Sequence, residues 1–535
     1  MKYDALDCPY PSRRLTSYAK RGMVATSQSL AAAAGLEILM QGGNAIDAAI
    51  ATAACLTVVE PTSNGIGGDA FAIVWHNGEM HGLNSSGPAP QSISIESVIK
   101  AGYSKMPELG PLAVTVPGAP AAWAELSRRF GKLALAKVLA PAITHASAGY
   151  PVSPTVSEAW KNGFARFKKA SPEHVFRPWF DTFAPSGSTP RPGEVWRSEA
   201  HARTLQSIAE THAESFYRGD LTEKISRFVQ QSGGFLSCDD LAAFSPEWVK
   251  PISVAYRGYE VWEIPPNGQG LVALMALNIL REFSFASRES VDTYHKQIEA
   301  LKLAFTDGRR FITDPKHMPV SVEQLLSPEY ARQRRDLMGE EALMPEPGKP
   351  ADGGTVYLCT ADSEGNMVSY IQSNYAGFGS GLVVPDTGIA LQNRGTGFSL
   401  DPDHPNHLMG GKKTYHTIIP GFLTRQGEPV GPFGVMGGFM QPQGHLQVVM
   451  NAIDHNLSPQ ACLDAPRWRW DEAKTIVVEH GFPKHIAEAL ARRGHNMKWS
   501  MGSGGFGRGQ IIWREPDGVL AGATEPRADG CVASW

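Results

Sequence analysis

The chain has 535 residues, which at about 150 residues per domain would suggest about three or four domains. Lys and Arg total 49 against 53 for Asp and Glu, so the net charge of −4 gives no basic excess for binding nucleic acid or an anionic membrane. Hydrophobic residues make up 42% and charged residues 19%, a balance that excludes extensive disorder. Glycine and proline are frequent, with 55 and 39 residues, which indicates many tight turns.

The N-terminal segment lacks the apolar stretch of about 7–15 residues that a signal peptide needs, and no segment reaches about 18 consecutive apolar residues. The cysteines are far apart and form no C-x-x-C pair, so zinc ribbons and thioredoxin-type chemistry have no support. They are Cys8, Cys55, Cys238, Cys359, Cys462 and Cys531. We therefore expect a cytoplasmic protein with reduced thiols, no metal, no cofactor and no membrane or nucleic-acid partner.

The first half of the chain alternates helical and strand patterns. A helix is predicted over 27–40 with Ser27 as its cap, and a second over 45–59 that is apolar on nearly all sides and therefore buried. Residues 70–86 indicate a hairpin with its turn at His76–Gly78. Polar helical stretches follow at about 120–150 and 200–230.

The second half continues in the same way. SVAYRGYEVWEI, residues 253–264, alternates as a strand, and amphipathic helices are predicted over 270–283 and 297–311. Residues 341–354, EALMPEPGKPADGG, have the composition of an exposed linker. A strand–turn–strand unit follows over 355–373, and further strands and a helix are predicted at 418–425, 428–435 and 444–456. The interleaving predicts a mixed α and β protein.

The junction Asp352-Gly353-Gly354-Thr355 offers a nucleophile. A threonine hydroxyl needs a base, and cleavage between Gly354 and Thr355 would place a new α-amino group, with a pKa of about 7.7–8, beside that hydroxyl. The glycines would allow the strained turn that exposes the scissile carbonyl. An ordinary turn before a strand is the far commoner explanation of an isolated D-G-G-T sequence, so these residues alone allow a threonine amidase without requiring one.

Two glycine-rich segments are further candidates. Gly434-Val435-Met436-Gly437-Gly438 lies between a strand and a helix, where adjacent N–H groups could face a developing oxyanion, although a simple turn is the alternative. Asn64–Phe71, NGIGGDAF, lacks the features of a phosphate loop or a dinucleotide fingerprint, so close helix–strand packing is expected. His404 and His407 lie in a proline-rich loop that we expect to be exposed, with no H-E-x-x-H arrangement.

Several separate motifs resemble the γ-glutamyltransferase family in family order. They include GGNAIDAAIATAACLTVVEPTSNGIGGDAF, TVPGAPAAW, GGFLSCDDLAAFSPEW, RGYEVWEIPP, DGGTVYLCTADSEGNMVSYIQS, HTIIPG, GVMGGFMQPQGH and DAPRW. The resemblance implies a self-cleaving N-terminal-nucleophile hydrolase of the α+β class, a four-layer αββα sandwich. It also replaces the linker interpretation: residues 1–354 would be a large chain and residues 355–535 a small catalytic chain, together one structural unit.

The resemblance assigns roles by position. Thr355 would be the nucleophile, first against the Gly354 carbonyl and then against substrate, and Gly437 and Gly438 would supply the oxyanion hole. Ser373 stands where the family has a threonine whose hydroxyl supports the nucleophile. Val356 replaces the second threonine of the usual pair, so any help from that hydroxyl is absent.

The substrate-binding positions depart from the family. Asn84 aligns with the arginine that binds the glutamyl carboxylate, and Gly397 with the acidic residue that binds the amino group. His416 and Thr417 replace paired serines, and Arg394 replaces a glutamine. Losing both charged contacts, at about 1.5–3 kcal/mol each, disfavours a γ-glutamyl head group. Arg394 and His416 could instead hold a small anion near Thr355, and the alternative for both is a structural hydrogen-bond role.

This pattern resembles a branch of the family that includes oxamate amidohydrolases of purine breakdown and glutathione-hydrolase-like and cephalosporin-acylase-like proteins. We therefore expect a self-processing amidohydrolase that converts a small amide such as oxamate to oxalate and ammonia through an acyl-Thr355 intermediate. The alternative is a γ-glutamyltransferase or glutathione hydrolase, and a second is an uncleaved, inactive binding protein. The two chains of one precursor would form a heterodimer, with any higher oligomer left open.

Overall fold

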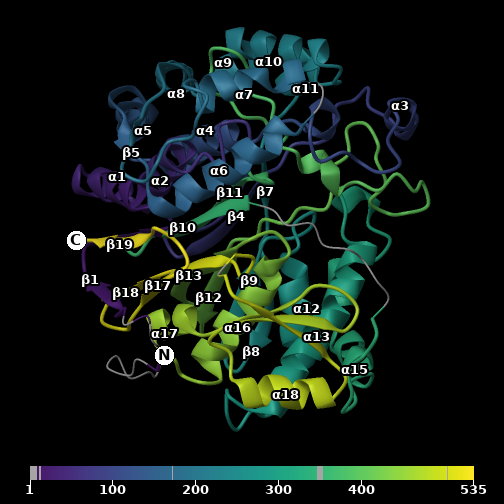
Figure 1. Cartoon of the computed structure of the whole chain (residues 1–535). Helices are drawn as coiled ribbons and strands as arrows, with labels where there is room; N and C mark the ends of the chain where they lie inside the picture. Colours follow the sequence, from purple (N-terminus) through teal and green to yellow (C-terminus); the bar gives the residue numbers. More distant parts are fainter. Residues whose placement is uncertain (1–8, 11, 13, 171–172, 346–353, 503) are drawn as a thin grey trace.

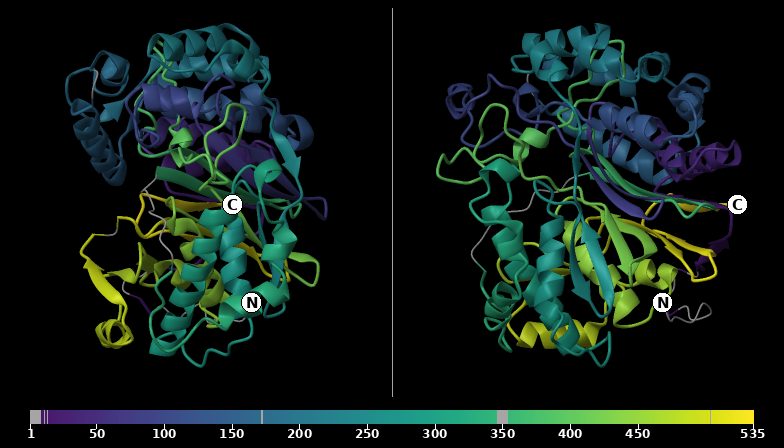
Figure 2. Two further views of the ribbon diagram at one scale, coloured as in Figure 1. Left: turned by 90° about the vertical axis from the view of Figure 1, so that its right-hand side faces the viewer. Right: turned by 180° about the vertical axis from the view of Figure 1, so that it is seen from behind.

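The computed structural model describes residues 9–10, 12, 14–170, 173–345, 354–502 and 504–535. Two central β-sheets lie face to face, and each is covered on its outer side by helices (Figure 1). The rotated views show the two helical layers on opposite sides of the paired sheets (Figure 2). The fold is therefore the predicted α+β arrangement of four layers, αββα.

Seven antiparallel strands form the first sheet. In spatial order they are β19 (Cys531–Ser534), β2 (Gly22–Thr26), β10 (Gly354–Asp362), β11 (Met367–Tyr375), β3 (Asp69–His76), β4 (Glu79–Ser85) and β7 (Glu247–Val249). The predicted hairpin at His76–Gly78 is confirmed as β3–β4, and the predicted strand–turn–strand unit as β10–β11.

Seven antiparallel strands also form the second sheet. They are β1 (Ser17–Ala19), β18 (Leu520–Thr524), β17 (Arg508–Arg514), β13 (Glu428–Met436), β12 (Gly421–Arg425), β9 (Tyr259–Glu263) and β8 (Ile252–Tyr256). Apolar side chains of both sheets fill the space between them, among them Phe71, Tyr357 and Ile371 from the first and Phe422 and Ile512 from the second. This alternation of inward and outward side chains is what a two-sheet core requires.

Helices of the first half of the chain cover the first sheet. They are α1 (Ser29–Met40), α2 (Ala45–Val59), α4 (Ala119–Phe130) and α5 (Leu135–Ala148), with α3 (Ile95–Lys100), α6 (Pro154–Lys168), α7 (Glu173–Phe183), α8 (Glu199–Thr211), α9 (Glu214–Arg218), α10 (Asp220–Gln231) and α11 (Cys238–Ala242) around them. Every residue of α2 is buried, as its uniformly apolar sequence predicts. A two-stranded sheet joins β5 (Tyr150–Pro151) to β6 (Val195–Trp196).

Helices from both halves of the chain cover the second sheet. They are α12 (Gly270–Leu280), α13 (Val291–Phe311), α14 (Val322–Leu325), α15 (Pro328–Arg335), α16 (Met440–Ile453), α17 (Pro459–Asp464) and α18 (Lys484–Arg492). A three-stranded sheet of β14 (Trp468–Trp470), β15 (Thr475–Glu479) and β16 (Asn496–Ser500) adjoins them. None of the described helices is both long enough and apolar enough to cross a bilayer.

Two local predictions are wrong in detail. The N-cap of α1 is Gln28, whose side-chain oxygen accepts from the N–H groups of Leu30 at 2.6 Å and Ala31 at 3.1 Å, while Ser27 donates to Glu60 instead. Residues 253–264 form parts of two strands, β8 and β9, joined by a turn at Arg257–Gly258 in which both φ angles are positive. A sequence with strand alternation on both sides of a short turn cannot be told from one strand by periodicity alone.

The two segments of the proposed cleavage are interleaved. In the first sheet, β2 of the N-terminal segment pairs with β10 and β19 of the C-terminal segment, and β3 pairs with β11. In the second sheet, β18 pairs with β1, and β12 pairs with β9. Neither of the two seven-stranded sheets is therefore formed by one segment alone. The residues 346–353 that precede the junction lie outside the described part of the chain.

Candidate active site

Two hydroxyl groups meet where β10 begins and β11 ends. Thr355 and Ser373 are both fully buried, and their Oγ atoms lie 3.1 Å apart. The register of β10 against β11 is irregular between Gly354 and Val356, so Thr355 sits in a local break of the ladder. The strand pairing thus brings the predicted nucleophile to its predicted supporting hydroxyl, across 18 residues of sequence.

Gly437 and Gly438 form the tight connection between β13 and α16. Their φ angles are +136° and +55°, a region that L-residues with a Cβ rarely adopt. A Cβ at Gly437 would also lie 3.0 Å from the Cα of Gly507. Only glycine fits this turn without strain, and the N–H groups of such a turn can point together toward one oxygen.

Gln269, which sequence reasoning missed, links this turn to the remaining site. Its side-chain amide donates to the carbonyl oxygens of Gly438, at 2.9 Å, and Thr417, at 2.6 Å. Its own oxygen accepts from the hydroxyl of Tyr415 at 3.0 Å. Gln269 precedes α12 in a sequence that carries no motif, so nothing local distinguished it from other loop glutamines.

Arg394 lies directly behind the hydroxyl pair. Its Nη1 donates to Thr417 Oγ1 at 2.8 Å and its Nη2 to Ser373 Oγ at 3.4 Å, and its guanidinium carbon lies 4.4 Å from the centre of the Tyr375 ring. Burial lowers the pKa of Arg394 to about 10, with the Asp69 carboxylate opposing this shift, so the group is charged at neutral pH. The structure therefore brings a cation to Thr355, and its donors orient the surrounding hydroxyls.

His416 does not join Arg394 in facing an anion. The N–H of Ile418 donates to His416 Nδ1 at 3.3 Å, so the neutral imidazole carries its proton on Nε2 and donates it to Asp69 Oδ2 at 3.0 Å. Burial and the Arg394 charge hold the pKa of His416 well below its usual value. The side chain is fully buried in this network, and these contacts favour the structural hydrogen-bond role; a role for His416 in binding substrate stays a prediction.

Asp69 is the acceptor at the centre of that network. It also accepts from Gln392 Nε2 at 2.9 Å and from the N–H of Gly87 at 3.3 Å. Burial raises the pKa of Asp69 to about 7, although Arg394 and these donors favour its charged form. The predicted close packing of its motif is also present, because a Cβ at Gly68 would lie 2.6 Å from the Ser373 carbonyl oxygen.

Asn84 is likewise engaged within the protein. Its Nδ2 donates to Asn267 Oδ1 at 2.9 Å, and its Oδ1 accepts from the N–H and the hydroxyl of Ser86 at 3.0 and 2.7 Å. Asn84 is buried and does not line either of the cavities described below. A role for Asn84 in binding substrate therefore stays a prediction that these contacts do not favour.

A cavity of about 230 Å³ lies next to the side chains that contact Arg394. Thr417 and Tyr375, which contact Arg394, form one part of its wall, and Gly397 lies beside them. Phe439, which follows the glycine turn, and Arg309 of α13 form another part. The cavity wall therefore contains Gly397 and Thr417, which align with substrate-binding positions of the family, and the residue that follows the glycine turn.

The loop after Gly397 forms a further part of the cavity wall. Phe398, Ser399, His404 and Asn406 all line it. The prediction of an exposed loop is wrong for His404, which is half-buried, and burial lowers the pKa of this side chain. Its Nδ1 accepts from the N–H of Asn406 at 3.0 Å, so the neutral ring carries its proton on Nε2.

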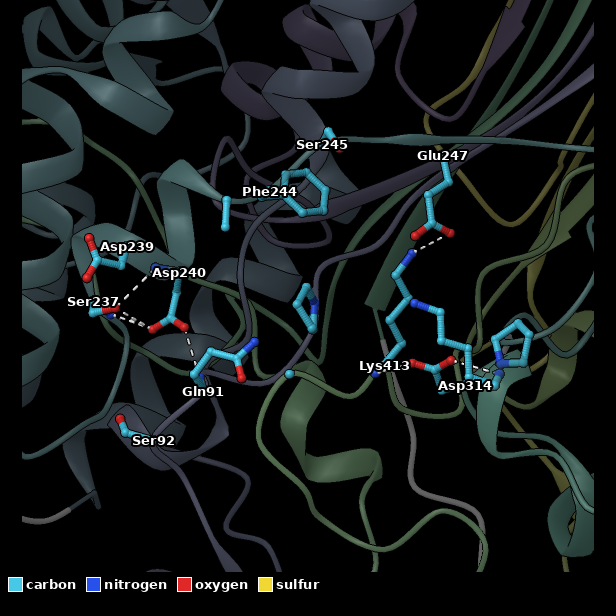
Figure 3. Close-up of a pocket in the computed structure, with 15 residues that line it drawn as sticks. Gln91, Ser92, Ser237, Asp239, Asp240, Phe244, Ser245, Glu247, Asp314 and Lys413 are labelled. Carbon is cyan, nitrogen blue, oxygen red and sulfur yellow. Dashed lines mark hydrogen bonds and ion pairs between the residues drawn. The ribbon is translucent and has the colours of Figure 1, made fainter.

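A second cavity, of about 730 Å³, lies between α11 and the segment around Asp314 (Figure 3). Its charged groups are largely paired or capped: Lys413 Nζ lies 3.0 Å from Glu247, and Asp240 accepts from the N–H of Gln91. None of the predicted site residues that the structure describes lines it. The smaller cavity is therefore the better candidate for the active site, because it adjoins Thr417 and Tyr375.

One group among the described residues has the composition of a metal site. His295, Glu299 and His495 are buried and offer ligand atoms within 4.8 Å of one another. Lys302 Nζ, however, already lies 2.6 Å from Glu299 Oε1, where it supplies the positive charge. The geometry therefore fits a buried ion pair better than a metal centre.

Comparison with known proteins defines the family. The family description "Gamma-glutamyltranspeptidase" matches residues 31–535. The chain is 36% identical over 522 residues to the glutathione hydrolase-like YwrD proenzyme of Bacillus subtilis (strain 168), with 95% of this chain and 98% of that protein covered. It is 35% identical over 528 residues to the oxamate amidohydrolase proenzyme of Klebsiella pneumoniae subsp. pneumoniae, with 96% and 98% covered. The crystal structure of cephalosporin acylase from Bacillus halodurans is similar with a TM-score of 0.96 and 63% identity, over 100% of this chain and 99% of that one.

The chain therefore belongs to the gamma-glutamyltranspeptidase family. It is a hydrolase of the N-terminal-nucleophile class, and a threonine nucleophile fits this family. Several relatives are named as proenzymes, which is typical of enzymes that mature into two chains.

Proposed function

We propose that the protein cleaves itself between Gly354 and Thr355 and then hydrolyses a small amide whose acyl part carries a carboxylate but no ammonium group. The buried pair of Thr355 and Ser373 hydroxyls, 3.1 Å apart at the start of β10, is the observation that carries this proposal. The Arg394 guanidinium next to the pair favours an anionic acyl group over a cationic one.

In the proposed reaction Thr355 Oγ attacks the amide carbonyl while its proton passes to the free α-amino group of Thr355. The N–H groups of Gly437 and Gly438 stabilise the negative oxygen that forms. The amine then leaves with the transferred proton, and the acyl group is held as an ester on Thr355. Water hydrolyses this ester, which releases the acid and restores the hydroxyl.

In this proposal Ser373 and Arg394 hold the nucleophile in position and do not react themselves. The Ser373 hydroxyl accepts from Arg394 and from the N–H of Tyr375, at 2.8 Å, so its own proton can be donated toward Thr355 Oγ. An oriented hydroxyl beside the nucleophile holds Thr355 in one rotamer and reduces the cost of reaching the attack geometry.

Oxamate is the smallest substrate of the proposed class, and the Klebsiella pneumoniae relative is named as an oxamate amidohydrolase. It has no amino group to bind, which suits a cavity with Gly397 in its wall. A γ-glutamyl substrate is the alternative, since other relatives are named as glutathione hydrolases. Acylase activity on a cephalosporin is a further candidate, favoured by the 63% identity to a cephalosporin acylase over the whole chain.

A panel on the cleaved protein tests these candidates. Ammonia release from oxamate, p-nitroaniline release from a γ-glutamyl anilide and deacylation of an acyl cephalosporin would be followed in parallel, with Thr355→Ala as the inactive control. We expect turnover of the amides with an anionic acyl group. Turnover of the γ-glutamyl anilide alone would overturn the proposed substrate class.

A further inference from the structure

An arginine that sequence reasoning missed lies in the wall of the 230 Å³ cavity. Arg309 comes from the last turns of α13, and its guanidinium carbon lies 5.0 Å from the ring centre of Trp470 and 5.4 Å from those of Phe305 and Phe439. Contact with three ring faces removes the side chain from much of the water and limits its rotamers. The cavity therefore contains a preorganised cation.

The charged residues in the cavity wall indicate the charge of the ligand that the cavity would bind. Among the described residues that line it, none is an aspartate or a glutamate, and Gly397 stands where the family resemblance places an acidic residue. A Cβ at Gly397 would lie 2.9 Å from Thr414 Oγ1, so the position is also closely packed. A cavity with arginine and no carboxylate in its described wall favours an anion over an ammonium group.

Aromatic side chains form a large part of the cavity wall. Tyr375, Phe398, Tyr415 and Phe439 line it, and the Tyr415 hydroxyl is used by Gln269. Aromatic walls suit methylene groups rather than further polar atoms. Ligand pockets commonly have volumes of about 300–1,000 Å³, so a cavity of about 230 Å³ suits a short chain.

We propose that Arg309 determines specificity by binding a terminal carboxylate of the acyl group, so that the preferred substrates are half-amides of short dicarboxylic acids. Methylene groups between the amide and the carboxylate lie along the aromatic wall, and the scissile carbonyl faces Thr355. This inference rests on the proposed hydrolase activity and refines its substrate class. It also predicts that oxamate, whose carboxylate is bonded directly to the amide carbon, is a poorer substrate than its longer homologues.

The test uses a homologous series on the cleaved enzyme. Oxamate, succinamate, glutaramate and the neutral valeramide would be compared in wild type, Arg309→Met and Arg309→Lys. We expect Arg309→Met to lower kcat/KM about 10- to 100-fold for the longer anionic amides and to leave valeramide unchanged, as loss of one charge-assisted contact implies. Arg309→Lys should restore part of the loss. Arg310→Met is the matched control, because Arg310 is the next residue of α13, is exposed and does not line the cavity.

A binding experiment tests the role of Arg309 independently of the proposed hydrolase activity. Glutarate, the product of glutaramate hydrolysis, would be titrated into the cleaved wild type and into Arg309→Met by calorimetry, which needs no turnover. Binding that disappears in Arg309→Met and persists in Arg310→Met supports the anion site even if every amide is inert, an outcome that would overturn the activity alone. Equal losses for valeramide and glutaramate, or glutarate binding unchanged in Arg309→Met, would overturn the role of Arg309.

Discussion

At the scale of single residues, the site depends on a buried guanidinium. Arg394 is only 1% exposed, yet it donates to hydroxyls on two different segments, Ser373 and Thr417. A buried charge must be compensated, and here the Tyr375 ring and the more distant Asp69 carboxylate do so. The arrangement places one positive charge beside Ser373, whose hydroxyl contacts Thr355.

Ser373 provides the first prediction at this scale. Ser373→Ala removes the hydroxyl 3.1 Å from Thr355 Oγ and leaves Arg394 Nη2 without that acceptor. We expect kcat to fall about 10- to 100-fold with little change in KM, because the lost contact acts on the nucleophile rather than on bound substrate. Steady-state kinetics on the cleaved protein would measure this. Ser373→Thr, which restores a hydroxyl, should recover most of the activity, and an unchanged kcat in Ser373→Ala would contradict the assignment.

At the scale of elements, α13 binds the end of the segment that leads toward the cleavage junction. Glu299 Oε2 accepts from the N–H of Leu343 at 3.0 Å, and Lys302 Nζ donates to the carbonyl of the same residue at 2.7 Å. One turn earlier on the helix, His295 Nε2 donates to the carbonyl of Gly339 at 3.0 Å. A fully buried ion pair thus binds both backbone groups of Leu343, twelve residues before Thr355 by sequence number.

The ion pair of α13 gives the second prediction. Removing one partner leaves the other charge buried and unpaired, so Glu299→Gln or Lys302→Met should each lower the free energy of unfolding by about 3–5 kcal/mol. The double variant should lose less than the sum of the two. Lys296→Met breaks a partly exposed ion pair with Asp292 on the same helix and should cost less than about 1 kcal/mol. Urea denaturation measures all four, and additive losses would contradict the pairing.

The elements that local sequence determines were predictable, and the details that depend on residues far apart in sequence were not. The helix at Ala45–Val59 and the hairpin at His76–Gly78 follow from local periodicity and turn residues, and both are confirmed. The cap of α1 was missed because Ser27 and Gln28 are adjacent, and a distant residue, Glu60, engages the serine. Local sequence cannot indicate which of two neighbouring polar residues finds a partner elsewhere.

The candidate site divides in the same way. The family resemblance placed Thr355, Ser373, Arg394 and Thr417, and the structure brings these four side chains together. The remaining contacts join residues far apart in sequence: His416 meets Asp69 across 347 positions. Arg309 lies on a helix with no motif and reaches the cavity only because α13 packs beside Phe439. Such contacts depend on the tertiary arrangement, which periodicity does not encode.

At the scale of the whole molecule, the segments on either side of the proposed cleavage share both seven-stranded sheets, which supports the proposal that they form one structural unit. Both seven-stranded sheets contain strands of residues 1–354 and of residues 355–535, and the hydrophobic layer between the sheets draws side chains from both segments. Cutting the chain at the junction would leave all of these pairings in place. We therefore expect the fragments to stay associated without a covalent link.

The third prediction concerns acid stability. Burial lowers the pKa of His201 to about 4, below its ordinary value near 6.5. Between these pH values the unfolded chain binds a proton that the folded protein does not, so this residue lowers the free energy of unfolding as the pH falls from about 6.5 to 4. His201→Gln should flatten that dependence by up to about 1.4 kcal/mol per pH unit. Denaturation curves across this range would measure it. His485→Gln, at an exposed position on α18, should leave the slope unchanged, and an unchanged slope in His201→Gln would contradict the assignment.

The central claim is that Thr355 cleaves the chain and then acts as an N-terminal nucleophile. Intact mass spectrometry of the purified protein, with denaturing and native electrophoresis of the same sample, tests it most directly. We predict two fragments, the smaller comprising the 535 − 354 = 181 residues from Thr355 to Trp535, which migrate together under native conditions. Thr355→Ala should give one full-length species. A wild-type protein that stays uncut, or a Thr355→Ala variant that is cut at the same bond, would contradict the account.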